Sequence, residues 1–114
     1  MSNGDGGPLK PARATEVIRN IARGDPKMDW KAHAREQMLA RDLLVGDAMH
    51  VLKFGFVHEE AEPASQNGFY KYRMEYATPN SNGRSVRVIV IPSVQQKALK
   101  VVTVMWADEP LNRG

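Results

Sequence analysis

Three ionisable side chains occupy alternate positions in one short segment, namely Lys71, Arg73 and Glu75. Alternate residues of a β-strand share a face and repeat about every 7 Å, so this spacing predicts one charged strand face. Two cations there can bind a phosphate, and a carboxylate beside them can transfer a proton. Arg87 interrupts the β-branched segment 85–91 and predicts a further phosphate-binding cation. The competing interpretation is a solvated sheet face whose charges prevent aggregation.

His33 is the other residue suited to chemistry, because an imidazole changes its charge near neutral pH. It precedes Arg35 near the start of a predicted helix, so His33 could transfer a proton while Arg35 assists in binding phosphate. The competing interpretation is a half-buried histidine hydrogen-bonded to the backbone. Arg41 falls in the apolar stripe of the same helix, and we expect it to pair with Asp47 or with a strand carbonyl.

The composition of the 114-residue chain restricts other kinds of site. No cysteine is present, which excludes a disulfide or a thiolate metal site. His33, His50 and His58 lack the spacing of metal ligands, and there is no glycine-rich phosphate loop, so we expect no metal and no cofactor. No apolar run has membrane-spanning length and the N-terminus is polar, so we expect a cytoplasmic protein without a membrane partner.

Charge is distributed unevenly around a formal net charge of +3. The segment 69–106 has six Lys/Arg and one acid, whereas the charged residues of 56–68 are all acids, Glu59, Glu60 and Glu62. The expected sheet is therefore more basic than the whole chain. This permits nucleic acid as a partner without requiring it.

Apolar residues recur at helical spacing in the N-terminal half and predict three helices. The first covers 11–23, the second begins at Trp30 with Asp29 as its N-cap, and the third covers 45–54 with Gly55 as its C-cap.

After Gly55 the period changes from helical to alternating, which predicts strands at 56–60, 69–77, 85–91 and 99–106. Short turns between sequential strands favour an α+β fold, with two or three helices on one face of an antiparallel meander of three or four strands. The expected sheet contribution to the core is Tyr70, Tyr72, Met74, Val86, Val88, Val90, Val102 and Val104.

The expected domain organisation is simple. We expect a disordered lead over residues 1–9, a single domain over 10–106, and a polar tail over 107–114.

One pattern in the helical half resembles a known family. It reads His33-x-Arg35-x-x-Met38-x-x-Arg41, followed by Asp47, Val51-Leu52 and Gly55. It is similar to a bacterial domain family of unknown function that is grouped with the RelE/ParE-type toxins of type II toxin–antitoxin systems. The family's Arg-Gly-Ile-Ser turn is altered here, because Asp42, Leu43 and Leu44 follow the arginine and the usual Ser cap is missing.

The resemblance implies a RelE-like fold and a toxin that acts on RNA or the translation machinery and is neutralised by a co-encoded antitoxin. Such a toxin is an endoribonuclease that needs no metal, since the ribose 2′-OH attacks the neighbouring phosphate. The residues assigned to catalysis are then His33, Glu75 and Arg73, and those assigned to RNA phosphates are Arg35, Lys71 and Arg87.

Two alternatives remain open at this point. Three helices and a β-hairpin can form a winged helix that binds DNA, although the third helix has one cation, Lys53, where base and phosphate contacts need several. A toxin of this fold can also block a protein target without catalysis.

Overall fold

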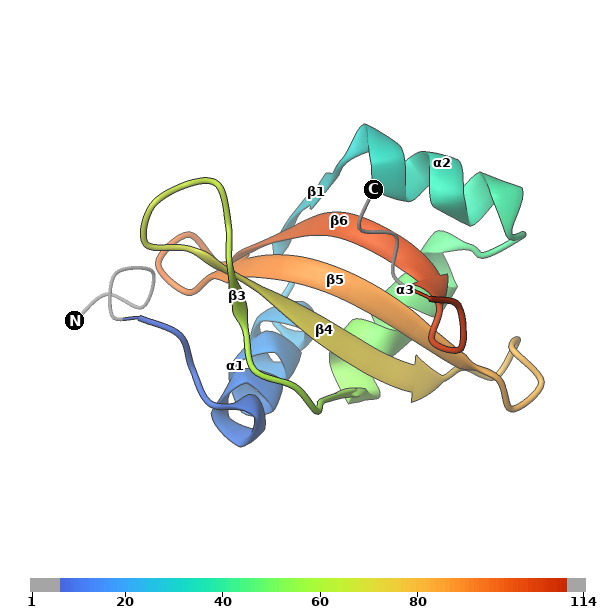
Figure 1. Cartoon of the computed structure of the whole chain (residues 1–114), viewed down its shortest axis with the longest axis horizontal. Coiled ribbons are helices and arrows are strands. Elements are labelled where there is room, and N and C mark those ends of the chain that lie inside the picture. Colours follow the sequence, from blue (N-terminus) through green and yellow to red (C-terminus); the bar gives the residue numbers. More distant parts are fainter. Residues whose placement is uncertain (1–6, 111–114) are drawn as a thin grey trace.

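Helices and strands make up most of residues 7–110, which the computed structural model describes (Figure 1). The helices are α1 (Pro11–Arg23), α2 (Ala32–Ala40) and α3 (Val45–Phe54). The strands are β1 (Lys27–Trp30), β2 (Phe56–Val57), β3 (Glu62–Pro63), β4 (Tyr70–Ala77), β5 (Ser85–Ser93) and β6 (Ala98–Trp106).

The strands form one mixed sheet in the order β1-β6-β5-β4-β2, and β3 pairs with β4 beside β2. Strands β4, β5 and β6 form the expected antiparallel meander. Strand β1, however, pairs with β6 in parallel. The predicted α+β class is therefore confirmed. The prediction of a purely antiparallel sheet of three or four strands is wrong, because the sheet has six strands and a parallel edge.

The segment Lys27–Trp30 is a strand where the sequence pattern predicted the start of a helix. Its residues alternate between exposed and half-buried, which is the period of a strand. Asp29 is thus not an N-cap, and α2 begins only at Ala32. Trp30, Ala34 and Met38 are spaced four residues apart, which suggested a longer helix. In the structure only Ala34 and Met38 are buried residues of α2.

One face of the sheet packs against α1 and α3 and forms the hydrophobic core; Figure 1 shows both helices behind the sheet. Six of the eight predicted sheet positions are buried, namely Tyr72, Met74, Val86, Val88, Val90 and Val104. Tyr70 is half-buried at the edge of this core. Lys71 and Arg73 lie on the opposite face of β4, so the predicted strand register is confirmed.

A β-bulge explains why the prediction for Val102 is wrong. Val90 pairs with Val101 and Ile89 pairs with Thr103, so Val102 is an extra residue in β6. Val101 is fully buried in its place. A bulge inverts the alternation of the residues that follow it, and the sequence pattern assumed an uninterrupted period of two.

Asp47 ties the start of α3 to the end of β4. Its Oδ2 accepts the backbone N–H of Leu44 at 2.9 Å, and its Oδ1 accepts the hydroxyl of Thr78 at 2.8 Å. The carboxylate therefore supplies the cap that the leucine side chain cannot provide. The expected pairing of Arg41 with Asp47 is wrong, because the partner of Arg41 is Glu109.

The expected lead and tail fall largely on residues 1–6 and 111–114, which lie outside the described residues. Their described parts contact the sheet. The N–H of Leu9 donates to the hydroxyl of Tyr72 at 2.8 Å, and the N–H of Ala107 donates to the carbonyl of Ser85 at 2.8 Å. None of the helices within residues 7–110 is long and apolar enough to cross a membrane.

Candidate phosphate-binding groove

The face of the sheet that α1 and α3 leave open carries a polar groove. Helix α2 flanks it along β6, and Figure 1 is viewed from this open side. The groove has a volume of about 500 Å³. Its lining comes from α2, the sheet, the segment before β4 and the turn after β6: His33, Gln37, Arg41, Glu62, Lys71, Arg73, Ile89, Thr103, Met105, Glu109 and Pro110.

The two cations of β4 differ in how far their charge is compensated. The guanidinium of Arg73 donates to Glu59 at 2.9 Å and to Glu62 at 2.9 Å, and its side chain is 20% exposed. Lys71 has no carboxylate within 4.0 Å among residues 7–110. Glu62 lies opposite Lys71 in the pairing of β3 with β4 but does not form a close ion pair with it. An anion entering the groove therefore meets Lys71 without an ion-pair partner to displace, whereas Arg73 must first exchange a carboxylate partner.

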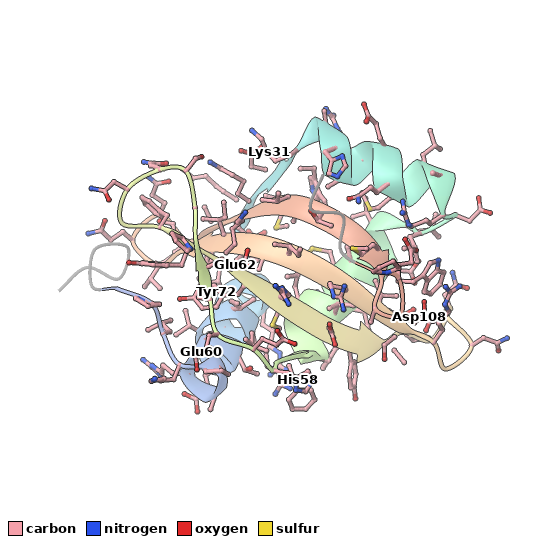
Figure 2. The ribbon with its side chains drawn as sticks, viewed as in Figure 1. Lys31, His58, Glu60, Glu62, Tyr72 and Asp108 are labelled. Atoms are coloured by element: carbon pink, nitrogen blue, oxygen red, sulfur yellow. The ribbon has the colours of Figure 1, made fainter. Side chains whose placement is uncertain are left out.

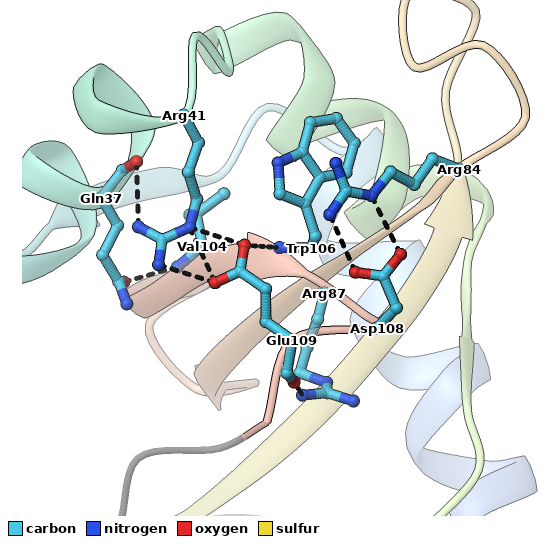
Figure 3. A network of polar contacts seen from close by, with 8 residues as sticks. All are labelled: Gln37, Arg41, Arg84, Arg87, Val104, Trp106, Asp108 and Glu109. Carbon is cyan, nitrogen blue, oxygen red and sulfur yellow. Dashed lines mark hydrogen bonds and ion pairs between the residues drawn. The ribbon is translucent and has the colours of Figure 1, made fainter.

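The opposite wall is an ion-paired network between α2 and the turn after β6 (Figure 3). Arg41 donates to both carboxylate oxygens of Glu109, at 2.7 and 2.9 Å. These hydrogen bonds hold the pKa of Glu109 below its ordinary value and raise the pKa of Arg41. Glu109 consequently remains a carboxylate at neutral pH and has no proton to donate there.

The same wall also protects the β6 edge beyond the end of β1. The side-chain oxygen of Gln37 accepts the N–H of Val104 at 3.0 Å, and Glu109 accepts the N–H of Trp106 at 3.3 Å. Side chains thus take the place of a neighbouring strand along this half of β6.

Glu75 and Arg87 lie directly opposite each other on β4 and β5. Arg87 donates to Glu75 at 2.8 Å and to the carbonyl of Ala107 at 2.9 Å. Its side chain is only 12% exposed, and neither residue lines the groove. Through these hydrogen bonds Arg87 and Glu75 connect the sheet to the turn after β6.

His33 lies on the surface of α2 and lines the groove, whereas Arg35, two residues later, is exposed and does not. His33 is the only histidine among the described lining residues, and Arg73 keeps Glu62 in an ion pair. Strands β4 and β6 are separated by β5, so the groove floor is about 10 Å wide. The structure therefore brings His33, Lys71 and Arg73 to one groove and places Arg35, Glu75 and Arg87 outside its lining.

Sequence reasoning missed two carboxylates of the groove. Glu62 belongs to the acid-only segment before β4, and Glu109 lies in a region expected to be a tail. The acid-only run next to a basic strand was the available signal for Glu62. No comparable signal existed for Glu109, because its contact with Arg41 joins distant parts of the chain.

No group of three or more His, Asp or Glu side chains within residues 7–110 is arranged to hold a metal ion.

Fold and groove together define an α+β domain with a mixed sheet whose open face carries a charged groove. Residues 30–106 match the family described as Domain of unknown function (DUF4258). Because this match covers more than half of the chain, the protein belongs to that family. No curated protein and no solved structure matches the chain. The resemblance to a family of unknown function is thus confirmed, and no named relative links it to RelE/ParE toxins.

Proposed function

We propose that the groove binds RNA phosphates and that the protein is the toxin of a type II toxin–antitoxin system, acting as a metal-independent endoribonuclease. The observation that supports this most directly is the shared lining of the groove. It combines an imidazole from α2, His33, with two cations from β4, Lys71 and Arg73. A proton-transfer group opposite cations is what cleavage of a phosphodiester by its own 2′-OH requires.

In the proposed reaction the ribose 2′-oxygen attacks the adjacent phosphorus and loses its proton to His33. A bond forms between the 2′-oxygen and phosphorus while the bond from phosphorus to the 5′-oxygen breaks. The departing 5′-oxygen takes up a proton from water, and the products carry a 2′,3′-cyclic phosphate and a 5′-hydroxyl. Lys71 and Arg73 stabilise the charge that develops on the phosphate oxygens.

The winged-helix alternative has less support. The candidate recognition helix, α3, buries Ala48, Val51 and Leu52. Its exposed positions include Val45 and Phe54 rather than arginines or lysines. A DNA-reading helix presents cations and hydrogen-bonding side chains to the duplex.

The proposal is tested by incubating the protein with RNA, in the presence and absence of ribosomes, and analysing the ends of the products. We expect cyclic phosphate ends from the wild type and at least about a hundredfold slower cleavage by His33→Ala. Glu36→Ala is the control, because Glu36 is exposed on the same helix and does not line the groove. Equal rates for both variants would contradict the proposal.

A neutralising partner is part of the same proposal. The basic segment 69–106 favours a co-encoded antitoxin that presents acidic side chains to the open face of the sheet. Co-purification with the product of the neighbouring gene tests this. Absence of toxicity when the protein is expressed alone would contradict the toxin assignment, and toxicity without RNA cleavage would favour a toxin that blocks a protein target.

A further inference from the structure

A second surface gathers aromatic rings at the β2 edge of the sheet, away from α2. We call it the aromatic patch and define it as His50, Phe54, Phe56, His58 and Tyr76. Figure 2 shows His58 at the lower edge of the molecule, on the side opposite to α2. The patch is built from the end of α3, from β2 and the residue that follows it, and from the end of β4.

The rings of the patch contact one another while remaining accessible. Phe54, Phe56 and Tyr76 are 43%, 44% and 39% exposed. The centroid of the His50 ring lies 4.8 Å from that of Phe54 and 5.8 Å from that of Tyr76. The centroid of Phe56 lies 5.9 Å from that of Tyr76 and 6.1 Å from that of His58. Large rings normally become buried, so this contiguous exposed set marks a binding surface.

Cations from α1 are part of the same surface. The guanidinium carbon of Arg19 lies 4.5 Å from the centroid of Phe56, and that of Arg23 lies 5.0 Å from the centroid of Phe54. Arg19 is also fixed by hydrogen bonds to the carbonyls of Phe54 and Gly55, both at 2.9 Å. Its charge is therefore held in place before any ligand arrives.

Neither arginine is ion-paired within the described part of the chain. No carboxylate of residues 7–110 lies within 4.0 Å of Arg19 or Arg23. The guanidinium groups of Arg73 and Arg87, on the open face of the sheet, are both ion-paired. A ligand that combines negative charge with flat apolar groups therefore complements the patch.

We infer that the aromatic patch binds single-stranded nucleic acid by stacking bases on its rings, while Arg19 and Arg23 attract the phosphates. Aromatic platforms beside uncompensated cations are the usual means of holding an unpaired strand without reading its sequence. This inference rests on the proposed function in that RNA is the ligand, and it gives that RNA a second contact outside the groove. An acidic protein segment is the competing occupant, but it offers fewer flat groups to the exposed rings.

The test uses a fluorescent oligothymidylate, which lacks the 2′-OH and cannot be cleaved, together with an abasic oligomer of the same length. We expect the wild type to bind the oligothymidylate tightly. In the double variant Phe54→Ala, Tyr76→Ala the affinity should fall by about tenfold for each ring removed. Binding of the abasic oligomer should be weak and equal in both proteins. The matched control is Leu39→Ala, Val94→Ala, which removes two exposed apolar side chains outside the patch.

Two comparisons separate this inference from the proposed function. The double variant Lys71→Ala, Arg73→Ala should no longer cleave RNA. It should keep the part of its affinity for oligothymidylate that depends on Phe54 and Tyr76. If neither the wild type nor any variant cleaves RNA, the effect of Phe54→Ala, Tyr76→Ala on oligothymidylate affinity still decides whether the patch binds bases. Unchanged affinity in the ring variant, or equally tight binding of the abasic oligomer, would overturn the inference and leave the patch to a protein partner. Thermal unfolding of each variant verifies that the fold is retained.

Discussion

Lys71 and Arg73 are two residues apart on one strand, yet within residues 7–110 only Arg73 has an ion-pair partner. Sequence alternation predicted correctly that both leave the core, because side-chain direction in a strand is a local property. It could not predict that Glu59 and Glu62 compensate Arg73, because that contact depends on where the preceding segment lies against β4. The direction of each charged side chain was therefore predictable, while its charge environment was not.

Arg87 differs most from its expected role. The sequence placed it among the phosphate ligands. In the structure it bonds Glu75 and the carbonyl of Ala107, and its side chain is 12% exposed. Arg87→Ala is therefore expected to lower the free energy of unfolding by about 1–3 kcal/mol, because it leaves these acceptors without a donor. Urea denaturation measures this, and Arg13→Ala, in an exposed pair, should change stability by less than about 1 kcal/mol.

Gly55 provides a second test at the scale of one residue. A Cβ at this position would lie 2.6 Å from the carbonyl oxygen of Val51 and 3.0 Å from that of Glu75. Both are backbone atoms, so Gly55→Ala should push β4 away from α3 and destabilise the protein by about 1–3 kcal/mol. Gly46→Ala is the matched control, since a Cβ there meets nothing within 4 Å. It should be neutral or stabilise α3 by up to about 1 kcal/mol. Equal melting temperatures for the two variants would contradict this account.

At the scale of elements, the turn after β6 is attached to α2 through Arg41 and Glu109. The pKa of Glu109 lies below its ordinary value of 4.5 because Arg41 bonds its ionised form. A carboxyl with a depressed pKa in the folded state stabilises the protein above its unfolded pKa, and this contribution is lost as pH falls through the folded pKa. The free energy of unfolding of the wild type should thus exceed that of Glu109→Gln by about 1–2 kcal/mol at pH 7. This difference in stability should shrink as the pH falls below about 4.5.

Unfolding free energies measured across this pH range check the prediction. When Arg41 is also replaced by Gln, Glu109→Gln should change the free energy of unfolding by less, because the hydrogen bonds that lower the pKa of Glu109 are gone. A difference that stays constant down to pH 3 would show that the pair does not couple to folding as described.

Strand β3 and the residues before it act on the groove through the two partners of Arg73, Glu59 and Glu62. These carboxylates compete with any phosphate for the guanidinium. Glu59→Gln, Glu62→Gln should therefore tighten RNA binding by about threefold to tenfold, since each exposed ion pair contributes at most about 1 kcal/mol. The control Glu36→Gln, Glu60→Gln removes the same charge from exposed positions outside the lining. RNA affinity is measured by fluorescence anisotropy. An equal gain in affinity in both variants would show that the change in net charge, rather than competition for Arg73, causes the tighter binding.

Element prediction succeeded where the pattern was long. The strands β4, β5 and β6 and the helices α1 and α3 were predicted close to their observed positions, because each repeats its period over many residues. Strands β1 and β3 have four and two residues. Residues Lys27–Trp30 do alternate between polar and apolar, but a run of four residues is too short to distinguish a strand from the start of a helix. The pairing of β1 with β6 and of β3 with β4 is a long-range contact that local spacing does not contain.

On the scale of the whole molecule, the fold separates two surfaces. Helices α1 and α3 cover one face of the sheet, and α2 lies along β6, which leaves the groove on the open face. The aromatic patch lies at the far edge, where α1 and α3 meet β2. In the proposed mechanism an RNA strand that contacts both surfaces would pass around the β2 edge, so that the patch would hold the strand and the groove would cleave it.

The central claim, that the groove is a phosphate site, is tested most directly by the rate of RNA cleavage in two double variants of equal charge. Lys71→Ala, Arg73→Ala removes both groove cations, and Lys10→Ala, Arg13→Ala removes two exposed cations at the start of α1. We expect the groove variant to cleave at least about a hundredfold more slowly and the α1 variant to retain the wild-type rate. A groove variant as active as wild type, or an equal loss in both variants, would contradict the account.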